Sequence, residues 1–175
     1  MISTVAVIDY GSSNLRSVVN GLEAVAGSKH RVIVTDDNDV ILSADRIVFP
    51  GQGALGDCMA RLGTMGLIDT IRECARTRPF FGICLGLQSL MQSSEENNGT
   101  QGLALYEGHV LRFPLGPIRA DDGLLLKVPH MGWNEVHWKR PHPILDGIGN
   151  ATKFYFVHSY FVVPDDPNLT LGSSN

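Results

Sequence analysis

Short β-branched runs alternate with amphipathic stretches along the first half of the chain. Apolar runs of strand length occupy residues 4–8, 31–35, 45–50 and 79–84. Stretches that we expect to be helical occupy residues 14–26, 57–62, 67–76 and 85–93. Ser13 or Asn14 can cap the first of these helices. Strands that alternate with helices predict an α/β fold with a mostly parallel sheet and helices on both faces.

The second half of the chain has a different pattern. Strand-like runs separated by Gly and Pro occupy residues 103–113, 124–128, 134–139 and 153–163. We expect these runs to form antiparallel additions at an edge of the parallel sheet. The sequence contains no internal repeat, low-complexity segment or linker, so we expect residues 1–175 to form a single domain.

Composition excludes several classes of protein. Apolar residues make up 43% and charged residues 18% of the 175 residues, as in folded globular proteins. A net charge of −4 without a long basic run argues against nucleic acid as a partner. No stretch reaches the ~18 apolar residues that a membrane span needs, and the N-terminus lacks the basic region of a secretory signal.

The cysteines indicate a reducing compartment. There are three of them, widely spaced and without a CxxC pair, so neither a disulfide framework nor a metal site is expected. We therefore expect a cytoplasmic protein without a metal.

One cysteine lies in a turn that favours chemistry. Gly82 and Gly86 flank Cys84 in the pattern G-x-nucleophile-x-G, between a predicted strand and a predicted helix. Such a turn holds the nucleophile clear of the sheet and aims the N–H of Leu85 at the space before the sulfur. The helix that follows would favour thiolate over thiol. The alternative is a small core residue, which is our interpretation for Cys58 and Cys74.

A second glycine turn supports this hypothesis. Gly51 and Gly53 flank Gln52 at the end of another predicted strand, within the string FPGQGA. Two glycines around one residue permit a backbone that turns an N–H inward, or flips to do so. Taken alone, an ordinary strand-to-helix turn explains these glycines equally well. Together with the cysteine turn they predict a second oxyanion donor, since open α/β sheets carry their sites at carboxyl strand ends.

These strings resemble a known family. FFGICLGLQSL and FPGQGAL are similar to the class I glutamine amidotransferases that use a catalytic triad. DYGSSNLRS, PHMGWN and FYFVHSY further resemble the glutaminase subunits of imidazole glycerol phosphate synthases, of histidine biosynthesis, with PHMGWN the most specific string. The resemblance extends from residue 8 to about residue 160 and implies a flavodoxin-like sheet.

The resemblance also implies roles for individual residues in hydrolysing L-glutamine to glutamate and ammonia without a cofactor. Cys84 would attack the side-chain amide to form a glutamyl thioester, while the Leu85 N–H and the Gly51-Gln52 peptide would hold the oxyanion. The residues that would position glutamine are Gly53, Gln88, Ser159 and Tyr160. From the residues alone, Gln88 could equally be a solvated helix residue and Tyr160 ordinary strand packing.

A partner follows from the same resemblance. The family forms a heterodimer with a (β/α)₈-barrel cyclase that receives the ammonia through an internal channel. The residues that would face this cyclase are Tyr10, Gly11, Asn14, Trp133 and Asn134. A core aromatic is the common alternative for a single Trp such as Trp133.

The sequence departs from the family pattern at two places. Ser13 stands where the family has a glycine, and serine tolerates a positive φ less well. The family's nucleophile is also served by a His-Pro-Glu motif, yet none of the histidines is followed by Pro-Glu: His30, His109, His130, His137, His142 and His158. We therefore expect the natural protein to continue beyond Asn175 into that motif.

Two other functions stay open. The cysteine turn fits equally a glutaminase domain that serves anthranilate, guanylate or cytidylate synthesis. The missing His-Pro-Glu motif favours a third possibility, a pseudo-enzyme that binds glutamine or a barrel partner without catalysis.

Overall fold

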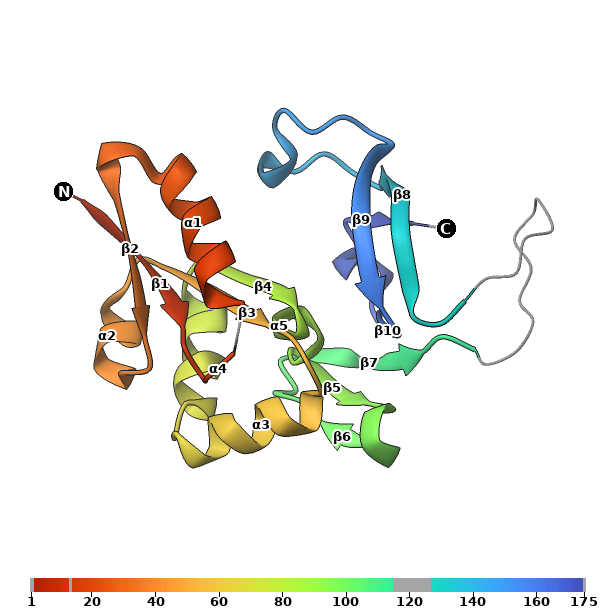
Figure 1. Ribbon diagram of the computed structural model, residues 1–175, viewed down its shortest axis with the longest axis horizontal. Helices are drawn as coiled ribbons and strands as arrows, with labels where there is room; N and C mark the ends of the chain where they lie inside the picture. Colours follow the sequence, from red (N-terminus) through yellow and green to blue (C-terminus); the bar gives the residue numbers. More distant parts are fainter. Residues whose placement is uncertain (1, 13, 115–126, 175) are drawn as a thin grey trace.

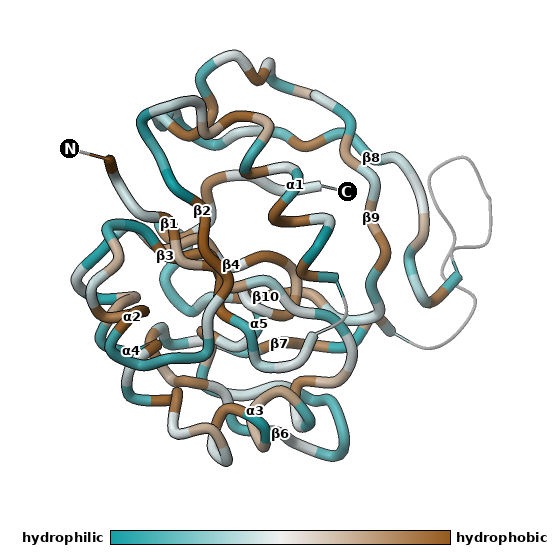
Figure 2. The backbone as a smooth tube through the Cα atoms, turned by 60° about the vertical axis from the view of Figure 1, so that its left-hand side comes forward, coloured by the Kyte–Doolittle hydropathy of each residue, from teal (hydrophilic) through white to brown (hydrophobic). Residues whose placement is uncertain are grey.

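The molecule is built on a parallel sheet of four strands. The computed structural model describes residues 2–12, 14–114 and 127–174. The strands lie in the order β2-β1-β3-β4, all pairs parallel, which is the order that begins a flavodoxin-like sheet. Their bounds are β1 Ser3–Ile8, β2 His30–Thr35, β3 Arg46–Gly51 and β4 Phe80–Cys84. Figure 2 shows hydrophobic stretches along these strands, in brown. The four predicted strands are therefore confirmed.

Alternate residues of the central strands enter two different hydrophobic clusters. Val5, Val7 and Val48 pack against helix α1 (Leu15–Ala26) on one face. The residues between them point to the opposite face and are all but fully buried: Ala6, Ile8, Ile47 and Phe49. Full burial of a large apolar side chain stabilises the fold by about 1.5–3 kcal/mol. Because both faces of these strands are buried, their sequences are apolar throughout and do not alternate between apolar and polar residues.

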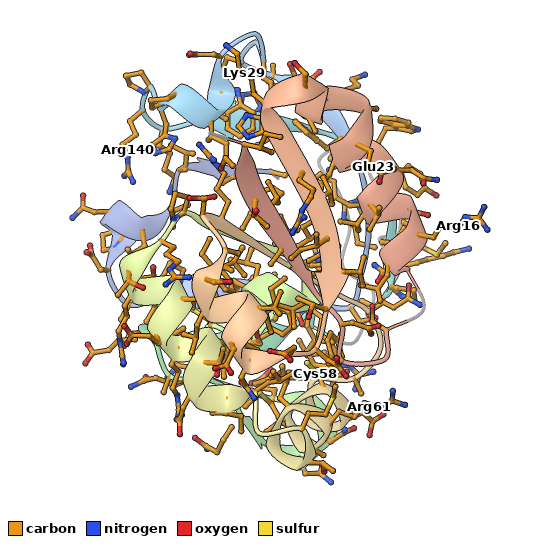
Figure 3. The ribbon with its side chains drawn as sticks, turned by 90° about the vertical axis from the view of Figure 1, so that its left-hand side faces the viewer. Arg16, Glu23, Lys29, Cys58, Arg61 and Arg140 are labelled. Carbon is orange, nitrogen blue, oxygen red and sulfur yellow. The ribbon has the colours of Figure 1, made fainter. Side chains whose placement is uncertain are left out.

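Helices cover both faces, as predicted. The second face carries α2 (Asn38–Ser43), α3 (Leu55–Thr64) and α4 (Ile68–Thr77). The outer side of α1 is polar, and Arg16 and Glu23 point away from the sheet (Figure 3).

Helix α2 was not expected from the sequence. Its six residues are too few for a helical period to be visible. The carboxylate of Asp37 caps it by accepting hydrogen bonds from the N–H groups of Asp39 and Val40, at 2.9 and 3.0 Å.

The start of α1 differs from the prediction. Asn14 is the N-cap residue but makes no capping hydrogen bond with its side chain. Its Oδ1 instead accepts from the Ser12 hydroxyl at 2.7 Å. Ser13, the other predicted cap, lies outside the described residues.

The second half of the chain forms two further sheets. One has the order β10-β7-β5-β6 and the other β11-β8-β9. The additions are mostly antiparallel, as predicted, but none of the strands in the described part of the chain joins them by hydrogen bonds to an edge of the parallel sheet. The bounds are β5 Met91–Ser94, β6 Thr100–Gln101, β7 Tyr106–Arg112, β8 His130–Trp138, β9 Thr152–His158, β10 Tyr160–Pro164 and β11 Gly172–Ser173. Short 3₁₀ helices lie at Gly27–Lys29, Glu96–Asn98, Pro143–Leu145 and Pro167–Leu169.

The β8–β9 ribbon stands beside the α/β body rather than on it (Figure 1). None of its residues is fully buried, and Trp133 is 67% exposed. The run at residues 153–163 proves to be two strands that part at Ser159 and enter different sheets. Most of the strand predicted at residues 124–128 lies outside the described residues.

Candidate active site

Cys84 occupies a strained turn between β4 and helix α5 (Leu85–Gln88). Its backbone has φ 54° and ψ −109°, in the positive-φ region that residues other than glycine rarely adopt. Its side chain is exposed, whereas Cys58 and Cys74 are buried. A strained backbone that projects an exposed thiol is the geometry expected of a nucleophile turn.

The two flanking glycines are required by close approaches of the backbone. A Cβ added at Gly82 would lie 2.7 Å from the carbonyl oxygen of Gly86. A Cβ added at Gly86 would overlap the carbonyl group of Phe49 in β3. Glycine at these two positions therefore lets β3, β4 and α5 pass closely without Cβ clashes.

The helix after the nucleophile is much shorter than predicted. We expected residues 85–93 to be helical, but α5 ends at Gln88 and the chain re-enters a strand at Met91. Ser89 follows α5 and is fully buried. Its hydroxyl donates a hydrogen bond to the carbonyl of Gly86 at 2.9 Å. Four residues generate little macrodipole, so α5 adds little to the stability of a thiolate at Cys84.

The second glycine turn lies directly beside the nucleophile. Gly51 ends β3 and pairs in register with Cys84, the last residue of β4. Gln52 is exposed, and Gly53 has φ 93°, which a glycine adopts without strain. The Leu85 side chain is 2% exposed, so the helix turn that presents its N–H is anchored in the core. The structure thus brings together the four residues predicted to form the nucleophile and its oxyanion donors.

The residues predicted to position glutamine come from two elements that meet. Gln88, half-buried, ends α5, and α5 contacts β10, which begins at Tyr160. Ser159 precedes that strand, and its carbonyl accepts from the N–H of Phe113 at 3.0 Å. The Tyr160 carbonyl is bonded to His158 Nδ1 at 2.9 Å. Both backbones are therefore fixed next to the helix that carries Gln88.

Tyr10 corrects one prediction. We expected it to face the partner, but its side chain is 4% exposed and its ring packs edge-on against Phe49, with centroids 5.6 Å apart. Its hydroxyl reaches Gly51, where an added Cβ would collide with it. The prediction for Tyr10 is wrong because β1 carries this side chain into the core beneath the second glycine turn.

The other predicted partner residues lie in two places. Gly11 is exposed at φ 87°, and its carbonyl accepts from the Arg61 guanidinium of α3 at 3.1 Å, while Asn14 is half-buried. Trp133 and Asn134 lie on opposite faces of β8 because successive strand residues alternate. Asn134 faces inward, with its Oδ1 3.2 Å from His130 Nε2, and only Trp133 presents a large exposed surface.

Sequence reasoning missed a cluster that joins the sheets of the second half. His130 Nδ1 lies 3.1 Å from His158 Nε2, and both imidazoles pack against Phe113 at the end of β7. Burial lowers the pKa of His158, while the Tyr160 carbonyl opposes this shift and His130 reinforces it. No signal in the sequence pairs these residues, because β8 and β9 are separated by a long loop.

In residues 2–12, 14–114 and 127–174, no group of His, Cys, Asp or Glu side chains is arranged to hold a metal ion. Over the same described ranges, no helix is long and apolar enough to cross a membrane.

The fold and the cysteine turn define the protein's class as a class-I glutamine amidotransferase. The family model described as "Glutamine amidotransferase class-I" matches residues 6–174. The fold is similar to that of PurLQS from Thermotoga maritima, with a TM-score of 0.63 and 20% identity over 99% of this chain and 75% of that one.

Sequence relatives are more specific. The chain is 51% identical to the imidazole glycerol phosphate synthase subunit HisH of Aromatoleum aromaticum, over 99% of this chain and 81% of that protein. It is 52% identical to the HisH subunit of Methylococcus capsulatus, over 94% of this chain and 76% of that one. The chain therefore belongs to the HisH family of class-I glutamine amidotransferases, and the resemblance and the fold class predicted from its motifs are confirmed.

Proposed function

We propose that this protein is the glutaminase subunit of an imidazole glycerol phosphate synthase and acts in the cytoplasm in histidine biosynthesis. The observation that carries the proposal is the exposed Cys84 at positive φ, paired in register with Gly51. Similarity to HisH subunits selects this synthase over the others that use the same fold. The substrate is L-glutamine, and no cofactor is required.

The geometry supports acyl transfer through a thioester. The Cys84 thiolate attacks the amide carbon of glutamine, a C–S bond forms, and the carbonyl electron pair moves onto oxygen. The N–H of Leu85 and the N–H of Gln52, once turned toward the sulfur, stabilise this oxyanion. Collapse breaks the C–N bond, and the nitrogen leaves as ammonia with the proton that the Cys84 thiol released on becoming a thiolate.

Deacylation returns the enzyme to its starting state. A water molecule attacks the thioester carbon, the C–S bond breaks, and glutamate leaves while the thiolate is restored. This water must give its proton to a base. The family's His-Pro-Glu motif does not occur in the sequence, so we assign the base to no residue here.

Substrate positioning follows from the meeting of α5 with β10. Gln88 and the backbone around Gly53 hold the amide end of glutamine next to Cys84. Ser159 and Tyr160 bind its α-amino and α-carboxylate groups. The hydrogen bonds that fix the backbone at Ser159 and Tyr160 support this role, because a rigid frame holds a substrate in reacting geometry.

The ammonia acceptor is a (β/α)₈-barrel cyclase that forms a heterodimer with this subunit and receives ammonia through an internal channel. Two surfaces are assigned to it, the loop at Gly11 and Asn14 and the exposed ring of Trp133. Trp133 stands opposite Tyr155 on the outer face of the ribbon, with ring centroids 5.5 Å apart. Exposed aromatic pairs of this kind are common anchors of protein interfaces.

The decisive experiment replaces the nucleophile in the natural subunit bound to its cyclase. Cys84→Ser should lower glutamine-dependent turnover by at least about a thousandfold. Turnover with free ammonia should persist, because that reaction belongs to the cyclase. Equal loss with both nitrogen sources would contradict the role of Cys84. Cys74→Ala, which alters a buried thiol of α4, serves as the matched control.

Two outcomes would select the alternatives. Recovery of a different synthase as the stable partner of the tagged natural subunit would assign the glutaminase to another acceptor. Full histidine biosynthesis in cells that carry only Cys84→Ala would show a non-catalytic binding protein.

A further inference from the structure

Two imidazoles meet where the chain passes from the β8–β9 ribbon into β10. His130 and His158 are register partners at one end of the pair β8 and β9. His130 Nδ1 lies 3.1 Å from His158 Nε2. His158 Nδ1 in turn lies 2.9 Å from the carbonyl oxygen of Tyr160. These three groups form a row that ends at the segment proposed to bind glutamine.

The donors and acceptors in this row follow from the chemistry of each group. A carbonyl oxygen only accepts, so the proton of the contact with Tyr160 is on His158 Nδ1. In a neutral imidazole the other nitrogen is then an acceptor. Burial lowers the pKa of His158, which favours this neutral form. His130 Nδ1 is therefore the donor of the 3.1 Å contact.

The ring of His130 is itself held from several sides. Asn134, four residues further along the same face of β8, has its Oδ1 3.2 Å from His130 Nε2. An amide can offer its oxygen or its NH₂ group to an imidazole, so this contact suits either state of that nitrogen. The Phe156 ring stacks on His130 with centroids 5.5 Å apart, and Phe113 packs edge-on at 6.3 Å. A ring fixed in this way can set the tautomer of the imidazole to which it donates.

His158 closes a short stretch of backbone around Ser159. Its Nδ1 donates to the carbonyl two residues further on, while the Ser159 carbonyl accepts from the N–H of Phe113 at 3.0 Å. At Ser159 the chain leaves β9 and enters β10, which pairs with β7 (Figure 1). Strand β10 also contacts α5, the helix that follows Cys84. The two hydrogen bonds therefore fix the backbone of this segment next to the nucleophile turn.

We propose that His158 and His130 are positioning residues for L-glutamine, with His130 fixing the tautomer of His158 and His158 fixing the segment Ser159-Tyr160. This inference rests on the proposed function, in which that segment binds the α-amino and α-carboxylate groups of glutamine. A proton on His158 Nε2 instead would leave Nδ1 as an acceptor facing the Tyr160 carbonyl, and two acceptors repel each other. The inner face of β8 thus serves the substrate, whereas the exposed Trp133, on the outer face, belongs to the surface assigned to the cyclase.

The kinetic test uses the natural subunit bound to its cyclase. His158→Ala removes the hydrogen bond to Tyr160 and should raise KM for glutamine about fivefold, the factor that one neutral hydrogen bond is worth. The value of kcat should stay within about twofold, because the α-groups of glutamine bind equally in the ground and transition states. His158→Asn keeps a donor at the place of Nδ1 and should return KM to within about twofold of the native value. His137→Ala, at an exposed position of β8, should change neither constant.

A second substitution isolates the effect of His130 on the tautomer. His130→Ala should raise KM about threefold when position 158 is histidine. In the His158→Asn background it should have no further effect, because an amide carries its donor permanently and has no tautomer to set. An equal effect of His130→Ala in both backgrounds, or a native KM in His158→Ala, would overturn the proposal.

The tautomer of His158 can also be measured without glutamine, by NMR of the natural subunit with isotope-labelled histidine. At a pH of about 8, above the ordinary histidine pKa near 6.5, the spectrum should show the proton of His158 on Nδ1. In His130→Ala the Nε2–H form should appear beside it. A native His158 that carries its proton on Nε2 would overturn the proposal whatever the kinetics show. If the complex hydrolyses no glutamine, the proposed function fails, while an Nδ1–H tautomer still supports the pairing of the two imidazoles.

Discussion

Gly51 and Cys84 stand opposite each other at the carboxyl ends of the neighbouring parallel strands β3 and β4. The turns at Gly51 and Cys84 are 33 residues apart in the sequence, since 84 − 51 = 33, and this pairing brings them together into one site. Because both strands end at the same edge of the sheet, a carbonyl carbon held at the sulfur is within reach of both turns.

The three thiols should differ sharply in reactivity. Cys84 is exposed, whereas Cys58 is 2% and Cys74 0% exposed. Burial raises the pKa of Cys58 to about 11 and also raises that of Cys74, so both are protonated at neutral pH. A thiol reagent should modify one cysteine in the native protein and the remaining two only after denaturation. The Cys84→Ser variant is the control, and rapid native labelling of that variant would contradict the assignment.

Substitution of the turn glycine Gly86 should destabilise the fold. A Cβ at Gly86 overlaps the carbonyl of Phe49, so Gly86→Ala forces β3 and α5 apart, with an expected loss of about 3 kcal/mol in unfolding free energy. Gly21 in α1 has no atom within 4 Å of an added Cβ, and Gly21→Ala should stabilise the protein by about 0.5–1 kcal/mol. Urea unfolding measures both, and equal stability of the two variants would refute the crowding at Gly86.

Stability should fall on mild acidification because of His158. Burial holds its pKa below the ordinary value near 6.5. The unfolded chain therefore binds a proton more readily than the folded one, so the stabilising contribution of neutral His158 is present above about pH 6.5 and is lost as pH falls below it. Thermal unfolding from pH 7.5 to 5 should show the decline in the native sequence.

The matched variants isolate this imidazole. His158→Asn keeps a donor for the Tyr160 carbonyl but cannot titrate, so its melting temperature should depend less on pH. His137→Asn, at an exposed position of β8, should follow the native curve. A pH dependence as steep in His158→Asn as in the native protein would assign the effect to other groups.

The contribution of the Asp37 N-cap to the stability of α2, the helix that the sequence did not predict, can be tested by substitution. Asp37→Ala removes the acceptor for two backbone N–H groups and should cost about 1 kcal/mol of stability. Asp36→Ala deletes a neighbouring carboxylate of the same charge and should cost little. Chemical denaturation distinguishes them, and equal effects would mean that net charge rather than capping matters.

Trp133 should dominate the affinity for the cyclase. Loss of an interface aromatic that anchors binding costs about 2 kcal/mol or more, which corresponds to roughly thirtyfold in Kd. Trp133→Ala should therefore weaken the heterodimer by at least that factor in calorimetry, while Val25→Ala, at an 81% exposed position of α1, should not. An unchanged Kd in Trp133→Ala would remove the β8–β9 ribbon from the proposed interface.

The sequence alone determined the parallel sheet and the nucleophile turn. Buried parallel strands require continuous apolar runs, and the turn requires glycine at two fixed positions around Cys84. Both features can therefore be recognised in the local sequence. The roles of Gln88, Ser159 and Tyr160 stay predictions.

Other features cannot be recognised in the local sequence, and only the tertiary structure decided them. The sequence of residues 153–163 reads as one strand, and only pairing with β8 on one side and β7 on the other divides it at Ser159. Residues 91–93 fall within the predicted helix, yet hydrogen bonds to β6 and β7 hold them in strand β5. Tyr10 has the character of a loop aromatic, but the path of β1 buries it under Gly51. In each case a contact between segments distant in sequence outweighs a local preference, because burial and sheet pairing contribute more free energy than intrinsic propensity.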